Sequence, residues 1–274
     1  METLLTVPAY VLVFALGAAI GSFLSVVVHR IPAGLSIVRP RSRCPVCGHQ
    51  LKSTENLPII GWLRLRGRCS ACHTPIPIRY PLLEAGCGVA FLCIFALHEL
   101  SWQTVSLWAL FSWLLALSLI DLDTMTLPEP LTRSGLVVGL GLQALIGWST
   151  TQTLTGAIAQ VMGGVLGAVL GIWLIDLIGW LGTAVLGKPA MGGGDAKLAA
   201  LMGAWLGWQL LLLAGFLAAL LGSVISAVAI ATGRLGRRQA FPFGPFLALG
   251  GMIAAIWGAA IVAAYLRLMF PSSN

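Results

Sequence analysis

Residues 7–28 read VPAYVLVFALGAAIGSFLSVVV and contain no charged side chain. About 20 apolar residues are enough for a helix to cross the hydrocarbon of a bilayer, so this stretch predicts a transmembrane helix. Residues 102–120, 210–232 and 243–266 are further uncharged stretches of this kind. The chain starts METLLTVPAY, without the Lys or Arg of a signal peptide's basic region, so we expect the first helix to be retained.

The composition of the whole chain points to the same class. Of its 274 residues 58% are hydrophobic and only 9% are charged, and the mean hydropathy is +0.94. A soluble domain carries roughly a quarter charged residues. Eight apolar segments follow one another, at 7–28, 81–98, 102–120, 133–148, 154–186, 196–208, 210–232 and 243–267. The sequence therefore predicts an all-α polytopic membrane protein with about eight transmembrane helices.

Basic residues are concentrated in one loop. Nine of the 16 Lys and Arg residues lie between Arg30 and Arg79, and the formal net charge is +7. We recognise no nucleic-acid-binding module in this loop, and few aromatic residues interrupt it, so we expect no nucleic-acid partner. Cytoplasmic loops of membrane proteins are enriched in Lys and Arg, which places this loop in the cytoplasm. Alternation of eight spans then puts the loop at Asp121 and residues 188–197 and 234–238 on the same side.

Two apolar segments have unusual lengths. Residues 154–186 form a run of 33, too long for one upright helix, so we expect it to tilt or to continue beyond the bilayer. Residues 198–208 number only 11, a length more typical of a re-entrant or interfacial segment. If this segment does not span, the basic cluster at residues 234–238 faces outward against the charge rule. We therefore favour the spanning interpretation.

The basic loop contains two Cys-x-x-Cys pairs, CPVC and CSAC, separated by 21 residues. Each pair can supply two corners of a tetrahedron, and four thiolates suit a structural zinc ion. The predicted metal ligands are Cys44, Cys47, Cys69 and Cys72. Redox-active pairs and ligation through His49 or His73 are the alternatives. Two further cysteines, Cys87 and Cys93, lie in a predicted span, where we interpret them as small buried apolar residues.

Two of the chain's four aspartates stand where apolar segments end or begin: Asp121 in LIDLDTMTLPEP and Asp195 in MGGGDAK. A carboxylate beside bilayer hydrocarbon is costly, so it usually faces a cavity or a partner and serves a function there. Two carboxylates can hydrolyse a peptide bond, because one takes a proton from water while the other, protonated, polarises the carbonyl. Close together they share one proton. We predict that Asp121 and Asp195 form such a catalytic pair.

The residues around Asp195 suit this chemistry. Gly192 and Gly194 let the backbone approach a substrate closely and adopt unusual dihedral angles. An extended peptide can pair edge-on with such a segment. Lys197 is close enough in sequence to tune Asp195 or to bind lipid headgroups. We therefore expect these residues to support the catalytic pair.

Other carboxylates leave alternatives open. Asp123 lies beside Asp121 and is a supporting candidate, but Asp121, Asp123 and Glu129 could instead cap helix ends at the membrane interface. Asp176, in WLIDLIGW, could be a buried carboxylate in its own right. No glycine-rich break adjoins it, and we interpret it as a helix-packing or interfacial residue.

With these motifs the chain resembles the bacterial prepilin leader peptidases, which are GxGD-type aspartic membrane proteases. GSFLSVVVHR (21–30) is similar to the family's first-helix motif, the two cysteine pairs to its cytoplasmic zinc site, and RYPLLE (79–84) to the start of its second span. LIDLDTMTLPEP (119–130) and MGGGD (191–195) resemble its catalytic segments, and PFGPFLALGG (242–251) its last helix. The resemblance covers nearly the whole chain.

The resemblance implies an activity. It makes Asp121 and Asp195 the catalytic pair and ranks Asp121 above Asp123. The family removes the short basic leader of type IV prepilins and type II secretion pseudopilins after a glycine, on the cytoplasmic face of the bacterial inner membrane. Many members also methylate the new N-terminal residue with S-adenosylmethionine, an activity associated with the cysteine loop. Two positions differ, since Ser25 replaces the family's usual asparagine and Glu129 replaces an aspartate.

The implied parts are a first transmembrane helix at 1–28, a zinc-binding loop domain at 29–80 and a membrane peptidase core at 81–274. From the residues alone, two functions of other classes stay open. A proton-coupled transporter would use the aspartates as a relay and place them near the bilayer midplane. A membrane scaffold would use the zinc knuckles to bind a partner and would not need the aspartates.

Overall fold

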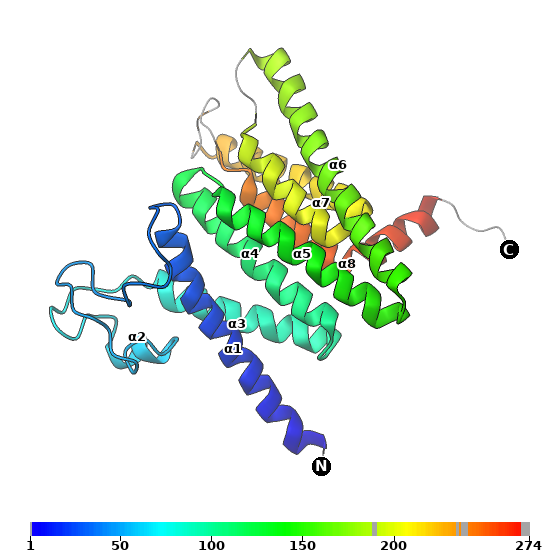
Figure 1. Cartoon of the computed structure of the whole chain (residues 1–274). Coiled ribbons are helices and arrows are strands. Elements are labelled where there is room, and N and C mark those ends of the chain that lie inside the picture. Colours follow the sequence, from blue (N-terminus) through cyan, green and yellow to red (C-terminus); the bar gives the residue numbers. More distant parts are fainter. Residues whose placement is uncertain (1, 188–190, 234–235, 237–240, 270–274) are drawn as a thin grey trace. The chain divides into compact units, whose positions relative to one another are not determined.

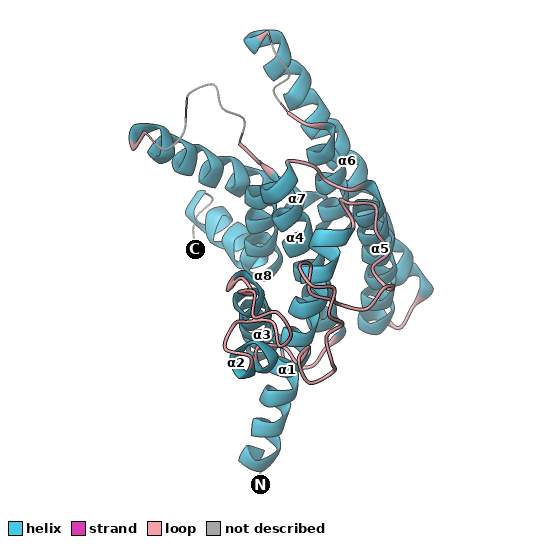
Figure 2. Cartoon of the chain, turned by 90° about the vertical axis from the view of Figure 1, so that its left-hand side faces the viewer, coloured by secondary structure: helices cyan, strands magenta, loops and turns pink. Residues whose placement is uncertain are grey.

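The computed structural model describes residues 2–187, 191–233, 236 and 241–269. The chain divides into two compact units, Met1–Trp108 and Ala109–Asn274, and the boundary falls within helix α4 (Trp102–Thr124). Figure 2 shows that the described elements are helices joined by loops. The other helices are α1 (Glu2–Arg30), α2 (Ile60–Arg64), α3 (Arg79–His98), α5 (Glu129–Thr151), α6 (Leu154–Leu186), α7 (Gly193–Ala231) and α8 (Gly244–Met269).

Within the described residues, seven helices are long and apolar enough to cross a membrane, namely all except the short α2. This confirms the predicted all-α polytopic membrane protein. The predicted segment 154–186 coincides with α6, and each of the other long helices extends a few residues beyond its predicted segment at one end or both. The predicted segments 196–208 and 210–232 both lie in α7, which explains why eight apolar segments correspond to seven candidate spanning helices.

In unit 1, α1 and α3 pack through small residues. A Cβ atom on Gly17 would lie 2.7 Å from the carbonyl oxygen of Cys87, and one on Gly21 would lie 2.8 Å from Cα of Glu84. Small residues allow helix backbones to approach closely in lipid, where no hydrophobic effect drives them together. Because the contact order is reversed along the two helices, they run antiparallel, as Figure 1 shows.

The packed face of α3 passes through Cys87, Phe91 and Ile94, which are all buried. Cys87 is fully buried, as predicted. Cys93 is exposed, so its interpretation as a buried residue was wrong. The reason is helical phase, because position 93 falls between the positions that follow the packed face.

In unit 2, α7 consists of two helical arms that meet at Gly207. Its φ of 72° and ψ of 174° interrupt the helix, and they lie in a backbone region that essentially only glycine occupies. The first arm, residues 193–206, is about 21 Å long at 1.5 Å per residue, shorter than the hydrocarbon thickness of about 30 Å. The break between the predicted segments 196–208 and 210–232 thus lies at Gly207, two residues before the expected residue 209, and the short segment before it is helical.

The two arms of α7 run in opposite directions. The second arm meets α8 in reverse order, through the pairs Leu210 with Gly258, Ala214 with Gly250 and Gly222 with Phe246. The first arm instead runs parallel to α8. Its Asp195 end lies toward Asp121, which contacts the start of α8, and its Met202 contacts Gly251 further along α8. The chain therefore turns back within α7, as Figure 1 shows.

The first arm of α7 forms the centre of unit 2. Every residue from Leu198 to Trp205 is buried, which is typical of a helix surrounded by other helices. Against it, α6 packs through Gly164, Gly167 and Gly171, which contact backbone atoms of the arm. Gly179 lies near Met191, and α6 continues from there to Leu186. The 33 residues of α6 thus extend past the beginning of α7, which Figure 1 shows.

Candidate functional site

Asp121 lies in the last turn of α4 and is buried, with 6% of its surface exposed. Its Oδ2 atom accepts a hydrogen bond of 3.0 Å from the backbone N–H of Gly244. Gly244 is the first residue of α8, and the first N–H groups of a helix have no partner within the helix. The positive end of the α8 dipole therefore points at this carboxylate.

Asp195 lies in the first turn of α7. Gly192, with extended dihedral angles, precedes the helix, and its carbonyl oxygen accepts a 3.1 Å hydrogen bond from the Asp195 N–H. The side chain is half-buried. The carboxylate of Asp121 acts electrostatically on that of Asp195, so the fold of unit 2 brings the two within mutual reach.

The two segments that carry these aspartates also touch. A Cβ atom on Gly194 would lie 3.0 Å from Cβ of Leu127, so the glycine leaves room for the loop that follows α4. Nζ of Lys197 lies 3.4 Å from Oε1 of Glu129, an oxygen that also pairs with Arg133 at 2.8 Å. Lys197 and Glu129 are each about half exposed, so the pair fixes position more than it adds stability.

The other acidic candidates lie elsewhere. Asp123 is exposed, two residues beyond Asp121. Asp176 is also exposed, on α6 next to Ile175, which packs against Ala196. Asp176 is therefore not a buried carboxylate.

Sequence reasoning did not anticipate the role of Gly244. It treated PFGPFLALGG only as a last-helix motif. A signal was present, because Gly-Pro directly before an apolar run marks a helix start, where free N–H groups can receive a carboxylate. Nothing in the sequence, however, specifies that Asp121 is the carboxylate that meets it.

The four predicted cysteine ligands form a compact cluster in unit 1. Their Sγ atoms all lie within 4.8 Å of one another, with 3.7 Å between Cys44 and Cys72 and 3.9 Å between Cys47 and Cys69. Tetrahedral zinc with Zn–S bonds of about 2.3 Å places its sulfur ligands about 3.8 Å apart. The donor set and its spacing therefore fit a structural zinc ion.

Each cysteine pair lies in its own backbone turn, and the two turns have the same conformation. The Cys44 N–H bonds to the His49 carbonyl and the Cys69 N–H to the Thr74 carbonyl, each at 2.9 Å. The residue after each pair has a positive φ, 71° at Gly48 and 57° at His73. His49 directs its ring toward Ser70 and Glu55 rather than into the sulfur cluster. Within the described residues, the metal-ligand cluster consists of the four cysteines.

The local surroundings lower the pKa of two of the four cysteines and raise the pKa of a third. The hydroxyl of Thr74 and its backbone hold the pKa of Cys72 at about 6, and the N–H groups of Cys47 and Val46 lower the pKa of Cys44. Although the His49 backbone opposes it, burial and the adjacent sulfurs raise the pKa of Cys47 to about 12. Four thiolates this close repel one another, and a coordinated cation removes that repulsion.

These features define a multi-pass helical membrane protein with a buried and a half-buried aspartate beside a glycine-rich helix start, and with a four-cysteine cluster that fits a metal ion. The model of the Bacterial Peptidase A24 N-terminal domain matches residues 15–98, and that of the Type IV leader peptidase family matches residues 108–227. The chain belongs to the type IV leader peptidase family.

Curated relatives cover almost the whole chain. The chain is 37% identical to a protein of Stutzerimonas stutzeri over 92% of both chains, and 37% identical to one of Pseudomonas putida over 96% of both. It is 35% identical to a protein of Aeromonas hydrophila over 93% of both. All three are named prepilin leader peptidase/N-methyltransferase. No solved structure is a significant match.

Proposed function

We propose that this protein is an aspartic membrane peptidase that removes the leader of type IV prepilins or type II secretion pseudopilins and then methylates the new N-terminus. The observation that carries the proposal is the placement of Asp121 and Asp195 on two segments of unit 2 that contact each other. Membership of the type IV leader peptidase family and the shared name of the three relatives support the same activity.

In the proposed reaction, the ionised aspartate of the pair takes a proton from water, and the water oxygen attacks the carbonyl carbon of the scissile bond. The protonated aspartate donates to the carbonyl oxygen. Collapse of the tetrahedral intermediate breaks the C–N bond and passes a proton to the leaving amine. The N–H of Gly244 holds Asp121 in place. Gly192, which is extended and exposed, leaves backbone accessible to an extended leader, whereas Gly194 lets the segment pack against Leu127.

The remaining parts have supporting roles in this proposal. Zinc bound by the cysteine cluster is structural, because four thiolates leave no open position for water. When bound, S-adenosylmethionine supplies an electrophilic methyl group for the new α-amine. For these roles we keep the division that the sequence predicts, with a first helix at 1–28, a zinc loop domain at 29–80 and a peptidase core at 81–274. The zinc loop and the aspartates lie on the cytoplasmic face of the inner membrane, following the distribution of Lys and Arg.

The test is cleavage of a prepilin reporter by purified enzyme, followed by mass spectrometry of the product. Asp121→Asn and Asp195→Asn remove the proton-transfer groups while preserving side-chain shape. We expect each to abolish cleavage, by at least about 10³-fold, because removal of either acid or base prevents the concerted proton transfer. The mass of the wild-type product reports both the cleaved bond and the added methyl group.

Asp176→Asn is the matched control, since Asp176 is an exposed carboxylate on α6 in the same unit. It should cleave at the wild-type rate. Cleavage at the wild-type rate by either Asp121→Asn or Asp195→Asn would contradict the two-aspartate mechanism. An equal loss in all three variants would instead favour a proton relay that uses the three aspartates together.

A further inference from the structure

The cysteine loop of unit 1 contains one short helix, α2, whose two faces differ. Ile60 and Leu63 are each 60% exposed, and their spacing of three residues puts them on the same face of the helix. On the other face Gly61 is buried, and Trp62 donates through Nε1 to the carbonyl oxygen of Ile76 at 3.1 Å. Trp62 also lines a cavity between the loop and the ends of α1 and α3, whereas Ile60 and Leu63 do not. The helix therefore directs an apolar face away from the interior of unit 1.

The residues that flank α2 fix its orientation. Ile59, directly before the helix, has a φ of 62°, and Arg66, after it, has a φ of 51°. A positive φ is rare for a β-branched residue and persists only where the surrounding structure determines it. The N–H of Ile59 donates a 2.6 Å hydrogen bond to Oε2 of Glu84 on α3, a residue that is 9% exposed. The apolar face of α2 is thus held in one direction by a buried contact with a spanning helix.

The same hydrogen bond sets the level of α2 in the membrane. Glu84 is the sixth residue of α3, so it lies about 7.5 Å along the axis from the start of this helix. Leu82, within the same candidate span, is 61% exposed, so lipid must reach this level. Figures 1 and 2 both show α2 beside the start of α3. The apolar face of α2 therefore lies at the boundary between headgroups and acyl chains, where interfacial helices bury their apolar face by about 5–10 Å.

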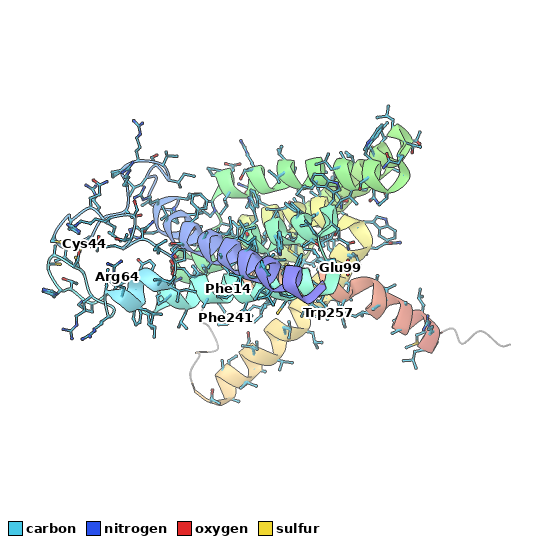
Figure 3. All side chains as sticks on the ribbon, turned by 90° about the horizontal axis from the view of Figure 1, so that it is seen from below. Phe14, Cys44, Arg64, Glu99, Phe241 and Trp257 are labelled. Carbon is cyan, nitrogen blue, oxygen red and sulfur yellow. The ribbon has the colours of Figure 1, made fainter. Side chains whose placement is uncertain are left out.

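Three basic residues accompany this apolar face. Arg64 ends α2, Arg66 and Arg68 follow it, and all three are exposed. The ion pairs among the described residues involve none of the three, so their charges are not compensated within unit 1. Figure 3 shows Arg64 at the loop end of the unit, opposite Glu99. Long basic side chains beside interfacial apolar residues can reach the phosphates of lipid headgroups.

We propose that α2 is an interfacial membrane anchor. Ile60 and Leu63 insert into the lipid leaflet on the side of the cysteine loop, and the three arginines bind the phosphates of anionic lipids. The bilayer is the partner that fits this surface, because the surface lies at the level of a spanning helix and combines apolar side chains with positive charge. A second copy of the chain would bring the same positive charges together, and a basic leader peptide would be repelled by them. The anchor is separate from the peptidase and methyltransferase activities and depends on neither.

Photo-crosslinking of the full-length protein in nanodiscs tests this anchor. Leu63 or, in a second variant, Ile60 is replaced by p-benzoylphenylalanine, and the adducts that form under ultraviolet light are identified by mass spectrometry. We expect phospholipid adducts at both positions. Leu16, which is 47% exposed within the span of α1, is the positive control. Val46 is 68% exposed and is the negative control, because its neighbour Cys44 lies in the outer part of the loop, beyond α2 (Figure 3). Metal content checks the fold of the loop in each variant.

The composition of the adducts tests the arginines. The nanodiscs contain equal amounts of phosphatidylcholine and phosphatidylglycerol with the same acyl chains. Adducts at Leu63 should be enriched in phosphatidylglycerol by about fivefold or more, the factor by which even one arginine near the headgroups favours an anionic lipid. The combined substitutions Arg64→Gln, Arg66→Gln and Arg68→Gln should return the ratio of the two lipids to the ratio found at Leu16.

Lipid adducts at Leu16 but none at Ile60 and Leu63 would overturn the anchor. Adducts at Val46 as frequent as those at Leu63 would also overturn it, because exposure rather than depth would then explain them. Crosslinks between two copies of the chain would assign the surface to self-association, and crosslinks that form only with an added prepilin would assign it to the substrate. A lipid ratio that the arginine substitutions leave unchanged would overturn the role of the arginines. None of these outcomes involves cleavage or methylation, so the proposed function is tested separately.

Discussion

At the scale of single residues, the carboxylate of Asp121 is held by a backbone group rather than by a side chain. The Gly244 N–H approaches Oδ2 at 3.0 Å, and the absence of a side chain on Gly244 makes that approach possible. A Cβ atom on this residue would lie 2.6 Å from the same oxygen. The start of α8 therefore requires glycine because a side chain would clash with the Asp121 carboxylate, and not because of the backbone dihedral angles.

Gly244→Ala should impair catalysis more than stability. The new methyl group must push the Asp121 carboxylate away, and a displacement of about 1 Å in a catalytic group can cost about 10²-fold in rate. Overpacking itself costs about 1–3 kcal/mol. Cleavage kinetics and unfolding of the purified protein would measure the two effects.

Gly215→Ala is the control for this change, because a Cβ atom on Gly215 meets nothing within 4 Å. It should retain full activity. A Gly244→Ala enzyme that cleaves at the wild-type rate would show that the contact between α8 and Asp121 has no catalytic role.

A second residue-scale prediction concerns His73, which has a φ of 57° at the position that Gly48 occupies in the other cysteine turn. Left-handed conformations cost a non-glycine residue about 1–2 kcal/mol. His73→Gly should therefore keep the full metal content and stabilise the turn by up to about 1 kcal/mol. Metal analysis and chelator titration would test this, with Gly48→Ala, which should weaken metal retention, as the opposite change. Loss of metal in His73→Gly would restore His73 as a ligand.

At the scale of elements, the turn at Gly207 reverses the direction of α7. The first arm carries Asp195 at its start, and the second arm runs back toward the end where Asp195 lies. A Cβ atom on Gly207 would meet only the Gly163 carbonyl, at 3.8 Å. Space is thus available, and the constraint is the backbone conformation alone. Gly207→Ala should destabilise the protein by about 1–3 kcal/mol, the usual cost of such a conformation in other residues.

Denaturant unfolding in mixed micelles would measure this effect. Gly163→Ala is the neighbouring control, because a Cβ atom there meets nothing within 4 Å and the residue is helical. It should be neutral or slightly stabilising, since alanine is the better helix former. Equal unfolding free energies for the two variants would show that α7 relaxes around position 207.

Elements were predictable to different degrees for physical reasons. The bounds of α6 follow from its sequence, because Thr153 caps its start and Gly187, with a φ of 66°, ends it. The segments 196–208 and 210–232 placed the turn in α7 at residue 209 rather than at Gly207, since the chain has 33 glycines and nothing in the sequence marks Gly207 among them. The prediction for Cys93 was wrong because an apolar helix in lipid lacks the polar stripe that would reveal its exposed face.

At the scale of the whole molecule, the functional residues can be predicted from the sequence, but the contacts between distant residues cannot. Carboxylates and cysteine pairs stand out in a chain with only 9% charged residues, so the aspartate and metal candidates can be named from residue types and spacing alone. A cavity of about 510 Å³ in unit 1, where α1, α3 and the cysteine loop meet, cannot be predicted in this way, because its walls come from residues more than 50 positions apart. The contact between Gly244 and Asp121 cannot be predicted from the sequence either, because the two residues are 123 positions apart.

The separation into units leads to a prediction about metal removal. The four cysteines lie in Met1–Trp108, and Asp121 and Asp195 lie in Ala109–Asn274. Chelation should unfold the cysteine loop, because a loop of this size builds little core without its metal. Trypsin should then cut at the many arginines of the loop, such as Arg43, Arg64 and Arg68. The helices of unit 2 should unfold at an unchanged temperature.

The two activities should respond differently to the same treatment. Methylation of a leader-free pilin should be lost with the loop, since the family resemblance associates methylation with the cysteine loop. Leader cleavage should fall less than about tenfold, because the described hydrogen bonds at Asp121 and Asp195 are made with Gly244 and Gly192 of unit 2. Re-addition of zinc should restore methylation, which separates metal loss from irreversible damage. If cleavage and methylation are lost in parallel and return in parallel, the metal loop also supports the peptidase site, and the two units do not act independently.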